Sequence, residues 1–392
     1  MKLTSKRYVI PYILITSLFF LWGFARAILD VLNQHFREVM DISITQSATI
    51  QVTTYLAYFL TAVPAGLFIS RYGYRHGVVC GLLLYALGAF LFVPGAAIGT
   101  LPAFLVCLFI IGMGLTFLET SANPYATELG PRSTATSRLN LSQSFNGLGC
   151  ALAPFILGEY LFSGGDVATP YVVMGVVVTL VAFVFARVEL PEITQDDADA
   201  TAGQAGAARL GKAVLFGFLA LLAYEVAEIS INSYFVIFLS GEGVTTNVEA
   251  SRLLSLALFI FMGGRFLGAW VMKYVHPTKV LLVCAIGSVL CMLGVLYGGK
   301  VSLYALVLNF AFESIQFPTI FSLALTGLDA QRTKRASSYL MMTPVGGCAF
   351  LLMGMIADSA SLVLPFCIPL AGFLMVLAFA LYKVRATARL GA

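Results

Sequence analysis

The chain has 392 residues, of which 59% are hydrophobic and only 11% are charged. Soluble globular domains carry roughly a quarter charged residues, so the composition excludes a water-soluble fold. The formal net charge of +4 is small, and the positions of Lys and Arg tie it to membrane topology rather than to nucleic-acid binding.

A helix that crosses a bilayer needs about 20 predominantly apolar residues. Twelve segments meet this requirement, and together they predict an all-α polytopic membrane protein with twelve transmembrane helices. In chain order the expected spans are Tyr8–Phe36, Ile44–Ser70, Gly77–Ala97, Leu101–Ala126, Leu139–Phe162, Tyr171–Val188, Ala213–Leu239, Ala250–Met272, Val280–Gly298, Leu303–Leu325, Ser337–Ile356 and Leu362–Tyr382.

A polar, Ala- and Gly-rich stretch between the sixth and seventh spans is typical of a flexible linker. It predicts three parts: an N-terminal six-helix bundle over 1–190, a cytoplasmic linker over 191–212 and a C-terminal six-helix bundle over 213–392. The two halves also repeat a pattern, because Glu119 precedes Pro124 by five positions and Glu313 precedes Pro318 by the same number. Internal duplication is common in secondary transporters, whose substrate site lies between the halves.

Positive residues set the expected orientation. With both termini in the cytoplasm, eighteen of the 23 Lys and Arg residues fall on the cytoplasmic side. Arg26 and Arg265 fall within spans, and Arg265 is expected near the cytoplasmic end of its helix, where it suits a gate or a contact between the halves better than a substrate contact. We therefore expect a multi-pass protein of a bacterial inner membrane with both termini cytoplasmic.

Several motifs narrow the family. The stretch from Gly66 to Arg75 resembles the loop signature of the major facilitator superfamily, with Ser70 where that signature usually has Asp. The segments LETSANPYATELGP, RLNLSQSFNGLG and SIQFPTIFSLAL resemble the fucose permease family of sugar–proton symporters. The resemblance covers the first eleven helices. It implies the major facilitator fold and proton-driven import of a monosaccharide, with L-fucose as the leading candidate.

Two acids are the candidates for proton coupling. Glu119 follows a run of 42 residues, Gly77 to Leu118, without a charged side chain, and an ionisable group at membrane depth is by default a functional-site hypothesis. Desolvation favours the neutral form of such a carboxyl, which suits a proton carrier. Glu119 matches the family acid in LETSANP, and Asp30 matches the family acid in the first helix.

Trp22, Arg26 and Asp30 follow one another at intervals of four, which places them on one helix face. Arg26 and Asp30 can neutralise each other as an i, i+4 pair. Alternatively, Arg26 pairs across the cavity with an acid of the seventh helix, Glu225 or Glu228. An unpaired Arg26 could instead recognise an anionic sugar.

The other candidate sugar-binding residues are polar or aromatic. Amides suit hydroxyl-rich ligands because they both donate and accept hydrogen bonds, although polar residues also join helices to one another in membranes. The resemblance implies that Gln143 and Asn146 contact sugar, whereas Asn140 is expected to join helices. The remaining candidates are Glu228, Asn232, Glu313, Gln316, and, for stacking on a sugar ring, Trp22 and Tyr55.

The sequence contains no catalytic constellation, no phosphate-binding loop and no metal-ligand spacing, so an enzyme and a cofactor are not expected. The expected partners are a sugar, protons and the lipid bilayer, with no nucleic acid and with a monomeric chain. The alternatives are a symporter for another hexose, an amino sugar or an anionic sugar, and a proton antiporter that exports amphipathic compounds.

Overall fold

The protein is described by a computed structural model, which covers residues 6–130, 135–188, 212–272, 274–325, 336, 339–340 and 342–390. The described residues form helices and connecting turns. A 3-10 turn, Lys6–Tyr8, leads into the first helix. The first half contains α1 (Val9–Met40), α2 (Ile44–Phe90), α3 (Phe92–Ile98), α4 (Leu101–Glu128), α5 (Ala135–Phe162) and α6 (Ala168–Arg187).

The second half begins at α7, whose first residue, Lys212, is the last residue of the predicted linker; the rest of that linker lies outside the described residues. Its helices are α7 (Lys212–Gly241), α8 (Asn247–Val271), α9 (Pro277–Tyr297), α10 (Lys300–Glu313), α11 (Gln316–Leu325), η3 (Thr343–Ala349), α13 (Phe350–Ser359), η4 (Leu364–Phe366) and α14 (Cys367–Leu390).

Eleven helices in the described residues are long and apolar enough to cross a membrane, and a shorter apolar helix covers Thr343–Ser359. The prediction of an all-helical polytopic membrane protein is therefore confirmed. The second and third spans run together as α2, and Gly73 makes the turn between them at φ 86°. A positive φ of this size is sterically costly for residues with a Cβ, which explains glycine at this point.

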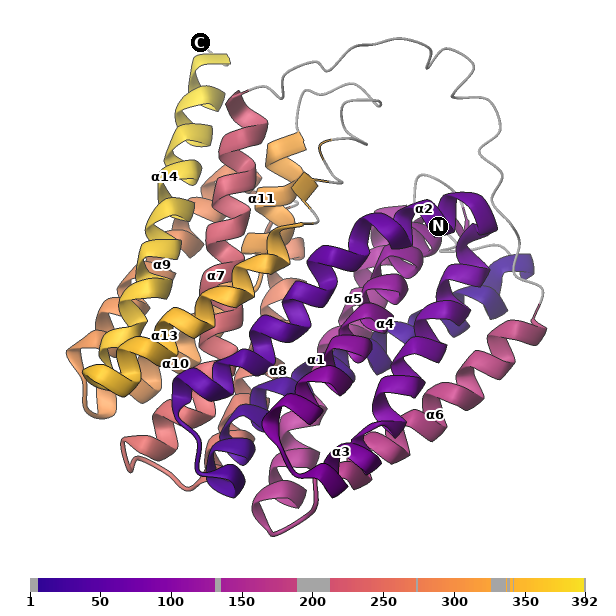
Figure 1. Cartoon of the computed structure of the whole chain (residues 1–392). Coiled ribbons are helices and arrows are strands. Elements are labelled where there is room, and N and C mark those ends of the chain that lie inside the picture. The colour runs from indigo at the N-terminus through magenta and orange to yellow at the C-terminus, as the bar shows by residue number, and fades with distance from the viewer. Residues whose placement is uncertain are drawn as a thin grey trace.

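The buried apolar side chains fall into two clusters. One is built from α1 to α6, and the other mainly from α7 to α14, with Ile44, Ala48 and Ala151 contributed by the first half. We call α1–α6 the N-terminal bundle and α7–α14 the C-terminal bundle. The two bundles lie side by side, and both chain termini lie at the same end of the molecule (Figure 1).

At the end away from the termini, which we call the closed end, the two bundles are joined by several contacts. Asp358 of α13 accepts hydrogen bonds from the backbone N–H groups of Ile44 and Thr45 at 3.0 and 2.8 Å, and so caps the N-terminus of α2. Arg252 pairs with Glu159, and Ser255 donates to the Ala151 carbonyl. These contacts hold the C-terminal bundle against the N-terminal bundle at the closed end.

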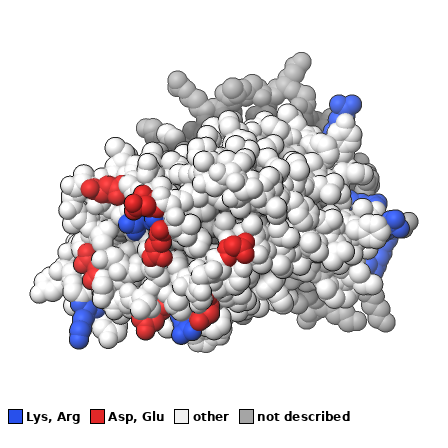
Figure 2. Space-filling model, turned by 60° about the horizontal axis from the view of Figure 1, so that its bottom comes forward, with Lys and Arg blue, Asp and Glu red and all other residues white. Residues whose placement is uncertain are grey.

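Exposed acids gather at the same end, where Figure 2 shows a group of Asp and Glu side chains. They include Glu38, Asp41, Glu159, Asp166, Glu242, Glu249 and Asp358. Two helices begin there with complete capping boxes: Ser43 with Gln46 for α2, and Thr246 with Glu249 for α8. Such caps bind N–H groups that have no partner within the helix.

The predicted tenth span, Leu303–Leu325, is not a continuous helix. It is interrupted between α10 and α11, at Ser314 and Ile315. Pro318 supplies a physical reason, because it has no N–H to donate to the Ser314 carbonyl four residues earlier. That carbonyl instead accepts a hydrogen bond from Nε of Arg265 in α8 at 3.2 Å. We call this interruption the α10–α11 break.

Candidate functional site

The N-terminal wall of the site depends on glycines that bring α1 and α5 together. A Cβ atom at Gly23 would lie 2.2 Å from the Asn146 carbonyl oxygen, and one at Gly149 would lie 2.2 Å from the Phe20 carbonyl oxygen. The close approach lets Asn146 Nδ2 donate to the Phe19 carbonyl at 3.1 Å. Asn146 is thus anchored to α1 through its NH₂ group, as a residue that joins two helices would be.

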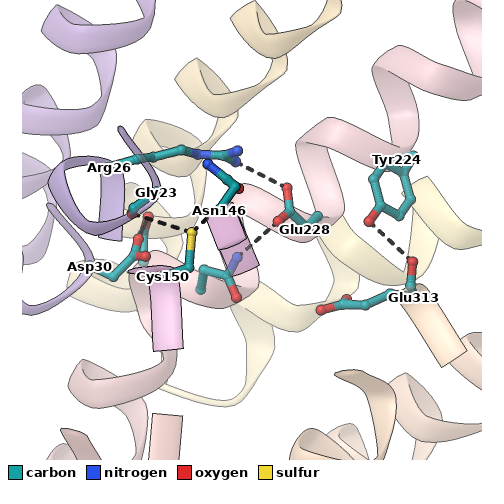
Figure 3. Close-up of polar contacts among 10 residues, drawn as sticks. Gly23, Arg26, Asp30, Asn146, Cys150, Tyr224, Glu228 and Glu313 are labelled. Carbon is teal, nitrogen blue, oxygen red and sulfur yellow. Dashed lines mark hydrogen bonds and ion pairs between the residues drawn. The ribbon is translucent and has the colours of Figure 1, made fainter. Parts of the chain in front are cut away.

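An ion pair crosses between the bundles next to this wall (Figure 3). Arg26 Nη2 of α1 lies 3.3 Å from Glu228 Oε2 of α7, and the two side chains are 33% and 11% exposed. Glu228 Oε1 also accepts from Asn232 Nδ2 at 3.1 Å. Of the two predicted arrangements for Arg26, the structure shows the pair across the cavity and no ion pair with Asp30.

Asp30 makes a second contact between the bundles. Its Oδ1 accepts a hydrogen bond from Oγ of Ser233 in α7 at 3.1 Å. A hydroxyl donor supplies no counter-charge, so Asp30 differs from Glu228 in having a hydrogen bond where Glu228 has an ion pair. The sequence had not indicated Ser233 as a partner, although it follows Asn232 on the same helix.

These residues surround a pocket between the two bundles, with about 530 Å³ of empty space that includes the part open to solvent. Six of the predicted residues line it: Arg26, Asp30, Tyr55, Asn146, Glu228 and Asn232. The wall is completed by Ala27, Gly147, Cys150, Ile229, Leu258, Phe261 and Arg265. Both bundles therefore contribute polar and charged groups to one pocket.

Three predicted residues of the N-terminal bundle lie outside this lining. Glu119 is half-buried on α4 and, among the described residues, has no hydrogen-bond partner, while Arg26 is the basic group that acts on it electrostatically. Gln143 donates to Asn123 Oδ1 at 3.2 Å, within its own bundle. Trp22 lies in a small apolar cavity with Leu82 and Leu118.

Two predicted residues of the C-terminal bundle also lie away from the pocket. Glu313 and Gln316 are fully buried and flank the α10–α11 break. Gln316 Nε2 donates to Ser288 Oγ at 2.8 Å, and Asn309 Nδ2 donates to Glu313 Oε2 at 2.6 Å. Because packing between helices encloses both side chains, we no longer assign either to the sugar-binding wall.

Arg265 was expected near the cytoplasmic end of its helix, as a gate or a contact between the halves rather than a substrate contact. It lines the pocket between the bundles and binds the α10–α11 break. Residue counting along one helix gave its depth but could not show that α8 turns this face toward the pocket. Phe261, four residues earlier on α8, lies on the same helix face as Arg265. On α5, Cys150 follows Asn146 by four residues and lies on the same face as Asn146. Such i, i+4 spacing from a known site residue could have identified Cys150.

The described residues contain no group of three or more His, Cys, Asp or Glu side chains that could hold a metal ion. Residues 14–350 match the model of the Major Facilitator Superfamily.

Curated relatives cover nearly the whole chain. The L-fucose-proton symporter of Haemophilus influenzae is 34% identical over 98% of this chain and 98% of its own length. The glucose/galactose transporter of Brucella abortus is 34% identical over 94% of this chain and 92% of its own length.

Solved structures agree on the fold. The fucose:proton symporter of E. coli, in the outward conformation, matches with a TM-score of 0.72 at 34% identity, covering 96% of this chain and 99% of that one. A D-xylose-proton symporter matches with a TM-score of 0.77 at 15% identity, covering 95% and 96%. The latter likeness concerns the fold alone. On the family match and the near-complete coverage of its relatives, the chain belongs to the fucose permease family of the Major Facilitator Superfamily.

Proposed function

We propose that this protein is a secondary transporter that imports a neutral monosaccharide together with protons, with L-fucose as the first candidate substrate. The observation that supports this proposal most strongly is the pocket between the bundles, whose wall combines carboxylates, amides and guanidinium groups from both sides. Such groups donate and accept hydrogen bonds in the directions that sugar hydroxyls require. The relatives named for L-fucose and for glucose or galactose support the same substrate class.

The charges in the pocket favour a neutral sugar over an anionic one. The positive charge of Arg26 is already paired with Glu228, so a uronate would have to compete with a carboxylate at 3.3 Å. Asp30 adds a further acid without a basic partner within ion-pair distance among the described residues. An anionic substrate would meet these acids as like charges, which disfavours its binding.

The transport cycle that we propose is alternating access. Glu119 loads a proton, sugar binds between the bundles, and the bundles rock to expose the pocket on the other side of the membrane. The Lys and Arg distribution supports placing both termini in the cytoplasm. On that orientation, the contacts at the closed end shut the extracellular side, so the conformation described here faces inward.

The test uses purified protein in proteoliposomes. Adding L-fucose outside should make the external medium more alkaline as protons enter with the sugar. A competition panel of L-fucose, D-glucose, D-galactose, an amino sugar and a uronate then ranks substrates against a labelled one. Sugar uptake without a pH change would rule out proton coupling, and competition by the uronate alone would rule out a neutral substrate.

The main competing function is export of amphipathic compounds by proton antiport. That function calls for a predominantly apolar pocket, whereas this pocket is lined by two Arg, two acids and two amides. Drug resistance on expression, in the absence of sugar uptake, would favour the exporter.

A further inference from the structure

We propose that the α10–α11 break is a second proton-binding site, with Glu313 as the residue that carries the proton during transport. This inference rests on the proposed function, since it concerns how many protons accompany each sugar. Discontinuous helices in transporters often provide ion sites, because interrupted backbone and side chains meet there at membrane depth.

The backbone carbonyls around the break already have donors from side chains. Ser314 Oγ binds the Ala311 carbonyl, Gln316 Nε2 binds the Phe312 carbonyl, and Tyr224 from α7 donates its O–H to the Glu313 carbonyl at 3.1 Å. Arg265 Nε binds the Ser314 carbonyl. A metal ion would have to displace these donors, including a guanidinium, in order to use the carbonyl oxygens as ligands.

Three side-chain oxygens at the break, unlike the backbone carbonyls, lack hydrogen-bond donors among the described residues. Glu313 Oε1, Asn309 Oδ1 and Gln316 Oε1 are buried, and none of them has a hydrogen-bond donor within the described part of the chain. Asn309, Glu313 and Gln316 are each fully buried. Within this part of the chain, none of these three oxygens accepts a hydrogen bond. A proton on the Glu313 carboxyl supplies an O–H donor at this place.

Burial also opposes a charged Glu313. No Lys, Arg or His nitrogen of the described residues lies within ion-pair distance of its carboxyl group, and an isolated buried carboxylate is costly. The titratable or charged groups that face it electrostatically are Glu228 and Tyr224 from α7, Arg265 from α8 and Cys291 from α9. Glu228 is an acid, and its repulsion further favours a proton on Glu313.

The break is also connected to the pocket. A proton bound at the break can therefore be exchanged during transport, rather than stay bound throughout. Arg265 lines the pocket and binds the Ser314 carbonyl, next to Glu313. Gly264 and Gly268 let α8 approach closely, since a Cβ at either would lie within 2.4 Å of Ser314 or Ile315 side-chain atoms. Arg265 belongs both to the pocket wall and to the break, so a change in its position when sugar binds changes the surroundings of Glu313, whose carboxyl then loses H⁺ in one state and binds it in the other.

The experiment measures the number of protons per sugar in proteoliposomes with the membrane potential clamped at zero. At equilibrium, two coupled protons give about 100-fold sugar accumulation across a tenfold proton gradient, and one gives about tenfold. We expect two for the wild type and one for Glu313→Gln, which keeps the shape and hydrogen bonding of the neutral acid. Glu313→Asp, which keeps a titratable group, should retain two.

Infrared spectroscopy gives a second readout that does not need sugar. The wild type should show a neutral carboxyl band near neutral pH that shifts in Asn309→Leu, because Asn309 bonds the carboxyl. A wild-type stoichiometry of one, a stoichiometry of two that survives in Glu313→Gln, or a carboxyl band unaffected by Asn309→Leu would each overturn the inference. These outcomes leave sugar–proton symport intact, whereas uptake with no proton coupling at all would refute the proposed function itself. Accumulation that depends on sodium and is lost in Glu313→Gln would overturn the inference about Glu313, because it would indicate a metal-ion site in place of a proton site.

Discussion

Two regions of the molecule share a sequence spacing but differ in structure. Glu119 in α4 and Glu313 in α10 each stand five residues before a proline. The helix α4 continues to Glu128 and leaves Glu119 half-buried, whereas α10 ends at Glu313 and leaves that side chain fully buried. The same local pattern therefore gives a half-buried acid in one bundle and a fully buried acid in the other.

Neighbouring helices account for the difference. In α4, the hydroxyls of Thr116, Thr120 and Ser121 bind the carbonyls of Gly112, Thr116 and Phe117, four residues earlier in their own helix. At the α10–α11 break, two of the donors come from other helices, Tyr224 and Arg265. A proline removes one hydrogen bond of a helix, and at the break Arg265 Nε binds the carbonyl that is left without its usual donor.

The largest effect is expected at Glu119. Combined with Glu313→Gln, which leaves one coupled proton, Glu119→Gln should abolish uphill transport, so that sugar reaches an inside-to-outside ratio of about one, because neither amide can carry a proton. Exchange of labelled for unlabelled sugar should persist. Counterflow and gradient-driven uptake are measured on the same vesicles. If the double variant still concentrates sugar, Glu119 is not the coupling site, and Asp30 or the acids of α7 become the leading candidates.

The packing of α8 against the break can be tested with a matched pair of glycines. Gly264→Ala places a Cβ 2.4 Å from Ser314 Oγ, so we expect a loss of about 1–3 kcal/mol of stability. Gly263→Ala is the control, because its Cβ meets no atom within 4 Å. Thermal unfolding in detergent compares the two. Equal melting temperatures would mean that α8 does not hold the break.

The ion pair between the bundles gives a smaller effect. Glu228→Gln leaves Arg26 without its counter-charge, and we expect a loss of roughly 1–2 kcal/mol, less than for a fully buried pair because Arg26 is 33% exposed. Arg26→Gln in the same chain should restore most of this stability. The control Asp30→Asn should cost less than about 1 kcal/mol, since an amide oxygen still accepts from Ser233. A larger loss in Asp30→Asn than in Glu228→Gln would show that Arg26 depends on Asp30.

The smallest effect is expected at the closed end. Asp358→Asn weakens the cap on the N-terminus of α2, and charge at a helix N-terminus contributes about 0.3–1 kcal/mol. The conformational equilibrium should shift toward opening of the closed end. Distances between spin labels on α2 and α13 report this shift, with Asp166→Asn as a control, because Asp166 binds Thr169 within one bundle. An unchanged distance distribution would show that the cap does not hold the bundles together.

Much of the fold could be predicted because the bilayer imposes a length and an apolar composition on every span. The place of Asp30 in the pocket and the pairing of Arg26 with Glu228 were also within reach, the latter as one of several alternatives. The α10–α11 break was not, since Pro318 has the same spacing from an acid as Pro124, which lies in a continuous helix. What separates them is the arrival of Tyr224 and Arg265 from helices distant in sequence, and residue order alone does not specify that contact.

The glycine contact between α1 and α5 has a consequence for how the transporter presents its cavity. Gly23 and Gly149 bring the two backbones so close that neither helix can slide past the other without a clash. Arg26, Asp30 and Asn146 therefore stay in fixed relative positions while their partners on α7 move with the other bundle. This half of the cavity is a preformed template. The conformational entropy of its side chains is lost once, when the protein folds, and not each time a substrate binds. Substrate arriving from either side of the membrane would meet the same template.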